Sequence, residues 1–288
     1  MARPALSASR AVAVLNFLAA HPTEAFTLSD ISMRLDINPA SAHALLTVLT
    51  DAGYLIRDAR LRTFALGPAV VALGTAALEA HPVIDVARDA ARDLAQQAGL
   101  EVALTAPGGE HIVFLARAGE PSAHGVPVHV GQRVPLVPPI GSVFVAWGNA
   151  EAWLAKAMDP ARLREVLEVV RRRGYSVALE AETRQQLGHA VDRLAADPSN
   201  CQLRAEVEML VSGLGEREYQ LQLLERTRHY DVSMIAAPIF GPAGHVVLAM
   251  TLLGFDGKLS GSEIAELGER LRDAALVVTR RTRGRRPA

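Results

Sequence analysis

The first 67 residues contain short apolar segments at helical spacing, separated by tight breaks. The first segment begins after Ser9 and ends near His21–Pro22. The second begins at Thr27, which is followed three residues later by Asp30. This spacing is typical of a helix start, because both side chains satisfy backbone N–H groups there or oppose the helix dipole. The pattern therefore predicts two short helices joined by a short connection.

A third helix and a hairpin are expected next. The four-residue break 36–39 leads into a segment with Leu45, Leu46, Val48 and Leu49, which ends at Gly53. Two short apolar runs, 54–56 and 63–66, then flank the polar turn 58–60, as in a β-hairpin. Three short helices followed by a hairpin predict a winged helix-turn-helix, whose third helix fits the major groove of DNA.

Length and composition favour a second domain. A chain of 288 residues is too long for one winged helix, and half of its residues are hydrophobic. The longest apolar runs, such as 134–147, contain prolines and are too short to span a membrane. No secretory signal is apparent, and the single cysteine, Cys201, excludes a disulfide framework. We therefore expect a cytoplasmic protein without a membrane partner, a metal or a cofactor.

Charge gives little support to nucleic-acid binding, because the net charge is −1 and affinity for DNA depends largely on neutralised phosphates. The arginines of the first 67 residues nevertheless fall in the N-terminal arm and the expected wing. The positions predicted to contact DNA are Arg10, Ser41, His43, Thr47, Arg57, Arg60 and Arg62. The alternative is that these side chains form an ordinary solvated surface.

The rest of the chain reads as an α+β domain with an antiparallel sheet and flanking helices. Helices are expected at 68–80, 82–97, 139–147, 160–173, 181–195 and 202–225, with a last one from Ser260 or Ser262 to about Arg280. Strands are expected at 101–106, 111–117 and 125–130, and a final hairpin at 232–240 and 245–254.

Several short stretches occur in an order that resembles the IclR family of bacterial transcriptional regulators. These stretches are 9–11, 28–31, 41–46, 53–58 and 64–67 in the first part, and 130–136, 173–175 and 235–240 in the second. The chain departs from the family at Ala44, where an arginine is usual, and at Ser41, where a threonine is usual. It is also longer than usual between Tyr175 and Tyr230.

The resemblance implies three parts: a winged helix-turn-helix at 1–67, a linker helix at 68–81 and a GAF-like effector-binding domain at 82–288. The positions that it assigns to the effector are Ile140, Gly141, Ser142, Met234, Thr251 and Leu253. Backbone N–H groups at Gly141 and Ser142, near a helix start, suit a carboxylate. Met234 and Leu253 make the expected site more apolar than one for small oxoacids, unless both are plain core residues.

The sequence thus predicts a DNA-binding regulator that senses a small carboxylic acid, the rest of which is an aromatic or acyl group. A homodimer or homotetramer is expected to bind a double-stranded operator. No nucleophile, metal or phosphate-loop motif of an enzyme is found. The alternative is a winged-helix scaffold for protein contacts, which Ala44 and the weak basic charge keep open.

Overall fold

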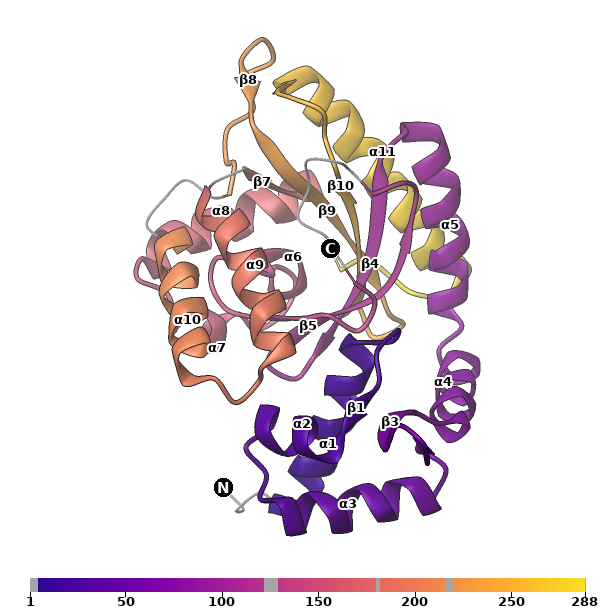
Figure 1. The fold of residues 1–288 in the computed structure, drawn as a ribbon. Coiled ribbons are helices and arrows are strands. Elements are labelled where there is room, and N and C mark those ends of the chain that lie inside the picture. Colours follow the sequence, from indigo (N-terminus) through magenta and orange to yellow (C-terminus); the bar gives the residue numbers. More distant parts are fainter. Residues whose placement is uncertain (1–4, 122–128, 180–181, 216–219, 288) are drawn as a thin grey trace. The chain divides into compact units, whose positions relative to one another are not determined.

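The computed structural model describes residues 5–121, 129–179, 182–215 and 220–287 (Figure 1). The chain divides into two compact units. Unit 1 is the N-terminal segment up to His81 together with Ala190–Glu206, and unit 2 is Pro82–His189 together with the segment from Val207 onward. No single helix of the described ranges is long and apolar enough to cross a membrane.

Unit 1 has the three helices and the hairpin that the sequence predicts. Its elements are α1 (Leu6–Ala20), β1 (Phe26–Thr27), α2 (Leu28–Arg34), α3 (Pro39–Asp51), β2 (Leu55–Asp58), β3 (Thr63–Leu66) and α4 (Pro68–Ala80). The strands form an antiparallel sheet in the order β1-β3-β2. The strand β1 was not predicted, because two residues are too few to show an alternating pattern. The winged helix-turn-helix is confirmed.

Local capping explains where α2 and α3 begin. The Thr27 side chain accepts a hydrogen bond from the Asp30 backbone N at 3.2 Å, and the Asp30 carboxylate accepts one from the Thr27 backbone N at 2.9 Å. The Thr27 hydroxyl also donates to the Asp30 carboxylate at 2.6 Å, and this bond together with the one from the Thr27 backbone N lowers the pKa of Asp30. Asn38 caps α3 by accepting from the backbone N of Ser41, and Pro39 occupies the first helical turn. The sequence pattern alone was enough to find both starts.

The core of unit 1 lies between the three helices and the sheet. On α3 the fully buried face consists of Ala42, Leu46 and Leu49. Val48, which belongs to the same apolar segment, is 66% exposed, and Leu45 is only half-buried. Because a helix advances 100° per residue, the spacing 42, 46, 49 keeps one face inward and turns position 48 to solvent.

Unit 1 also includes the residues that connect two later helices, α9 (Glu182–Ala196) and α10 (Cys201–Gly215). Arg34, at the end of α2, donates from Nη1 to the carbonyl of Ala196 at 2.7 Å. The backbone N of Ser199 donates to the Arg34 carbonyl at 3.1 Å. The Arg34 guanidinium lies over the rings of Phe17 and Phe26. The two helices were expected, but nothing in the sequence indicated this contact.

Unit 2 is built on a six-stranded antiparallel sheet in the order β6-β5-β4-β10-β9-β7. The strands are β4 (Glu101–Gly108), β5 (His111–Ala118), β6 (Arg133–Pro135), β7 (Ser176–Leu179), β9 (Val232–Phe240) and β10 (Val246–Leu253), with a separate pair β8 (His229–Tyr230) and β11 (Leu259–Ser260). The helices are α5 (Val83–Ala98), α6 (Ser142–Val145), α7 (Glu151–Leu154), α8 (Pro160–Arg173) and α11 (Gly261–Arg281).

The helices of unit 2 cover both faces of its sheet. The helices α5 and α11 pack on one face, where the main core forms (Figure 1). The short helix α6 packs on the other face, with Val143 against Ala236 and Ala249. The α+β class and the antiparallel sheet are confirmed.

Three expectations for unit 2 were wrong in detail. The strand expected at 125–130 lies mostly outside the described residues, and its described end, 129–130, is not a strand. The partner of β5 on that side is β6 instead. The helix expected at 139–147 is only α6, and the helix expected at 202–225 is α10, which does not include the described residues 220–225. Beyond the undescribed gap, Gln220 pairs with Ala178, because this stretch extends the sheet edge rather than the helix.

Candidate nucleic-acid interface and ligand site

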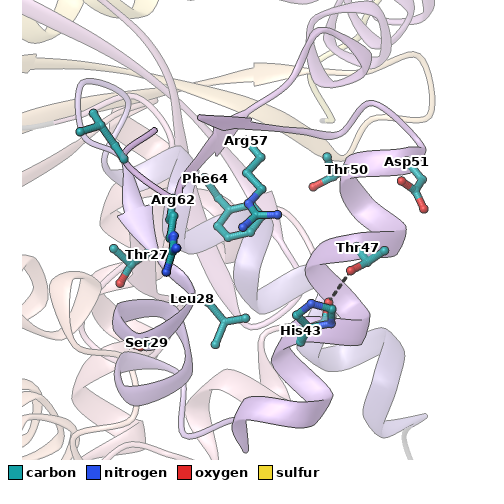
Figure 2. Close-up of a pocket in the computed structure, with 11 residues that line it drawn as sticks. Thr27, Leu28, Ser29, His43, Thr47, Thr50, Asp51, Arg57, Arg62 and Phe64 are labelled. Carbon is teal, nitrogen blue, oxygen red and sulfur yellow. Dashed lines mark hydrogen bonds between the residues drawn. The ribbon is translucent and has the colours of Figure 1, made fainter. Parts of the chain in front are cut away.

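A groove of about 510 Å³ lies in unit 1 between α3, the start of α2 and the wing formed by β2 and β3. Its lining residues are Thr27, Leu28, Ser29, His43, Thr47, Thr50, Asp51, Arg57, Leu61, Arg62 and Phe64. Figure 2 shows Arg57 within this groove, between the side chains of α3 and those from the start of α2. The groove thus gathers polar and cationic groups from three separate elements.

The α3 side of the groove is made by His43, Thr47, Thr50 and Asp51. Their spacing of four, seven and eight residues places them on one helix face, next to the buried face. The Thr47 hydroxyl donates to the carbonyl of His43 at 2.9 Å, as Figure 2 also shows, and this bond fixes its direction. Since its proton is used within the helix, the Thr47 oxygen presents an acceptor to the groove.

The wing side carries the positive charge. The Arg57 guanidinium lies 5.8 Å from the centre of the Phe64 ring. The Asp58 carboxylate accepts from the backbone N of Arg60 and of Leu61, both at 2.8 Å, which fixes the wing turn. Arg62 has a φ of 57°, a left-handed conformation that is uncommon for a residue with a side chain. Within the described ranges, no acidic side chain pairs with the guanidinium groups of Arg57, Arg60 or Arg62.

Four of the positions predicted to contact DNA line this groove, namely His43, Thr47, Arg57 and Arg62. Three do not line it: Arg10, which is half-buried on α1, Ser41 at the start of α3, and Arg60 at the wing turn. The groove also has lining residues that the sequence analysis missed, among them Ser29 and Thr50. Thr50 follows the helical spacing of His43 and Thr47 and could have been found by extending it.

The candidate ligand positions of unit 2 share one face of the sheet. Leu253 pairs with Met234 across β10 and β9, and Thr251 pairs with Ala236 on the same two strands. Side chains two residues apart point to the same face of a strand. Because α6 packs against Ala236, this is the face that α6 covers, opposite the core with α5 and α11.

The loop before α6 is tightly constrained. Gly141 has a φ of 84°, a left-handed conformation that residues with a Cβ rarely adopt, so this turn favours glycine. The Ile140 carbonyl accepts a hydrogen bond from Nε1 of Trp153 at 3.0 Å, and Ser142 is 2% exposed. With only four residues, α6 has a weaker dipole than the nine-residue helix that the sequence predicted. The case for a carboxylate at Gly141 and Ser142 is correspondingly weaker.

No cluster of three or more potential metal ligands occurs among the residues that the structure describes. The single cysteine, Cys201, is exposed at the start of α10.

Comparison with known proteins also indicates a helix-turn-helix regulator. Residues 7–59 match the model of the IclR helix-turn-helix domain. The chain is 27% identical over 266 residues to the HTH-type transcriptional regulator BhcR of Paracoccus denitrificans, which covers 92% of this chain and 83% of BhcR.

Solved structures match the whole fold. An IclR transcriptional regulator from Alicyclobacillus acidocaldarius has a TM-score of 0.68 at 19% identity, covering 96% of this chain and 99% of that one. An IclR homologue from Microbacterium hydrocarbonoxydans, complexed with 4-hydroxybenzoate, has a TM-score of 0.64 at 20% identity with the same coverage.

Proposed function

We propose that this chain, which belongs to the IclR family of transcriptional regulators, binds an operator through the groove of unit 1 and senses a small acid through unit 2. The regulator function itself follows from the family, because the curated relatives of this chain are transcriptional regulators rather than enzymes. The observation that carries the operator proposal is the convergence of His43, Thr47, Arg57 and Arg62 on one groove.

In this proposal α3 enters the major groove and the wing follows the backbone. His43, Thr47 and Ser41 face the base edges, because they lie on the outward side of α3 or at its start. Arg57, Arg62 and Arg60 contact phosphates from the wing, and Arg10 contacts the backbone from α1. Since Ala44 cannot contact a base by hydrogen bonds, specificity at this position rests on its neighbours.

Replacing His43 tests this docking. We expect His43→Ala to change the preferred bases at one position of each half-site, while Asp51→Asn, at the far end of the same groove, leaves the preference unchanged. Selection of binding sites from a random DNA library measures both. An unchanged preference for His43→Ala would mean that α3 does not dock in this way. A protein with no DNA preference at all would support the scaffold alternative.

A homo-oligomer is part of the proposal. The helix α4 is apolar and has no buried residue within its chain, with Val71 71% and Leu73 54% exposed. An apolar helix left exposed along its length favours association with a second copy. A dimer would place two α3 helices on two half-sites of a pseudo-palindrome. Sedimentation of the purified protein, with Val71→Glu as the disrupting variant, tests this point.

The effector proposed for unit 2 is a small carboxylic acid with an aromatic or acyl body. The apolar side chains Met234 and Leu253 are half-buried on the face that also carries Thr251. The homologue complexed with 4-hydroxybenzoate is similar in fold, which makes aromatic acids the first compounds to test. A thermal-shift screen is suitable, because a ligand at 100 times its dissociation constant raises stability by about 2.7 kcal/mol.

A further inference from the structure

An ion pair lies on the sheet face of unit 2 that α6 covers. Nη2 of Arg117 is 2.9 Å from Oε1 of Glu101. In the register of the sheet, Glu101 pairs with Leu253, while Arg117 pairs with Ala103, which in turn pairs with Thr251. All five residues share one face, because they alternate with core residues on the other. The ion pair is therefore adjacent to two of the candidate ligand positions.

Stability does not explain an ion pair in this place. Glu101 is 6% exposed, and the Arg117 side chain is 28% exposed. Burial raises the pKa of the Glu101 carboxyl, and the nearby Arg117 opposes that rise. Buried ion pairs often contribute less to stability than apolar side chains of the same size, because both charges lose their hydration. Charged groups held in such positions are instead typical of binding sites.

Two buried hydroxyls lie near the pair. Thr105 is 5% exposed and Thr251 is 7% exposed. Thr251 pairs with Ala103 across β10 and β4, and Thr105 lies two residues beyond Ala103 on β4, so all three side chains share one face. Within the part of the chain that the structure describes, neither side chain forms a hydrogen bond. Each hydroxyl therefore retains hydrogen-bonding capacity for an external group that reaches this face.

The chemistry of this surface suits a carboxylate joined to an apolar body. A guanidinium presents a planar fork of five N–H donors, which can serve Glu101 and a second carboxylate together. Hydroxyls next to it can orient the same ligand, and Leu253 and Met234 offer apolar contact. We propose that Arg117, positioned by Glu101, binds the carboxylate of the effector, with Thr251 and Thr105 as hydrogen-bond partners. This inference rests on the sensor function proposed above.

Replacing Arg117 with lysine tests the inference. Lysine keeps the positive charge beside Glu101 but loses the planar fork. The probes are benzoate and 4-hydroxybenzoate, each compared with its uncharged primary amide, in thermal-shift titrations of the full-length protein. We expect wild type to prefer acids over amides, and Arg117→Lys to weaken acid binding about tenfold without changing amide binding. Arg173→Lys is the matched control, because this half-buried arginine donates to the carbonyls of Leu221 and Gln222 instead.

A second variant covers the case in which Arg117→Lys does not fold. Glu101→Gln keeps the shape of the side chain but removes the negative charge that competes for Arg117. The proposal predicts tighter acid binding with unchanged amide binding, because the charge that attracts Arg117 away from the ligand is gone. A purely structural ion pair predicts a less stable protein with unchanged binding of both acids and amides.

Each result decides the matter. If wild type binds the acids and Arg117→Lys binds them equally well, Arg117 does not bind the carboxylate, and the acid-sensor function stands. If wild type binds no acid at millimolar concentration, the acid-sensor proposal fails and this inference fails with it.

Discussion

The wing arginines allow a quantitative prediction about DNA binding. Arg62 lines the groove, is exposed and has no acidic partner in the described ranges, so it is available for one phosphate. Each phosphate contact contributes about 0.9 to the slope of log K against log salt concentration. The dimer proposed above would present two wings, so Arg62→Gln should flatten the slope by about 1.8. Between 50 and 200 mM salt, wild type should therefore lose about tenfold more affinity than the variant.

Fluorescence anisotropy with the promoter DNA of the protein's own gene, titrated at several salt concentrations, measures both slopes. A duplex of random sequence should show the same flattening, because a phosphate contact carries no sequence information. The matched control is Arg285→Gln, which removes an exposed arginine from unit 2. Equal slopes for wild type and Arg62→Gln would refute the assignment of the wing to the DNA backbone.

Three further predictions concern stability and effector binding. Thr27→Val removes the cap of α2 and should destabilise unit 1 by about 1 kcal/mol, while Thr27→Ser should restore it, as measured by urea unfolding followed through α-helical circular dichroism. Thr251→Val should shift the effector binding curve about fivefold to higher concentration, the equivalent of about 1 kcal/mol. If the curves of this variant and of Met234→Ala both match the wild-type curve, the site lies elsewhere. Because burial raises the pKa of Glu101, the folded state holds its proton more tightly than the unfolded state, so its contribution to stability falls as pH rises through the raised pKa. Glu101→Gln should remove this fall, which urea titrations between acidic and neutral pH would detect.

Sequence patterns predicted the elements best where caps and breakers stand at both ends. The helix α8 was predicted with the observed bounds, because Asp159 caps it, Pro160 opens it and Gly174 takes the left-handed conformation that ends it. The helix expected at 202–225 was carried too far, because residues 220–225 keep a helix-like mixture of apolar and polar residues but are not helical. There the sheet decides, since the backbone N of Leu221 donates to the carbonyl of Val177.

The candidate sites were predictable only in part. His43 and Thr47 could be found because one helix sets their spacing, whereas Ser29 joins the groove from another helix. The pairing of Glu101 with Arg117 could not be read from the sequence, because it depends on strand register. A signal was nevertheless present, because each charged residue stands in a mainly apolar strand, next to residues that face the core.

The contact of Arg34 with Ala196 and Ser199 affects how this protein can be cut into pieces. A fragment that stops at His81 would contain every helix of the DNA-binding fold, yet it would lack the carbonyl and the backbone N–H that hold the end of α2. The Arg34 guanidinium, whose Nε already lacks a hydrogen-bond partner within the described residues, would then lose a further bond. The compact unit that contains the winged helix-turn-helix is thus discontinuous in sequence, and a fragment that keeps all of its contacts must include residues 190–206 together with the first 81.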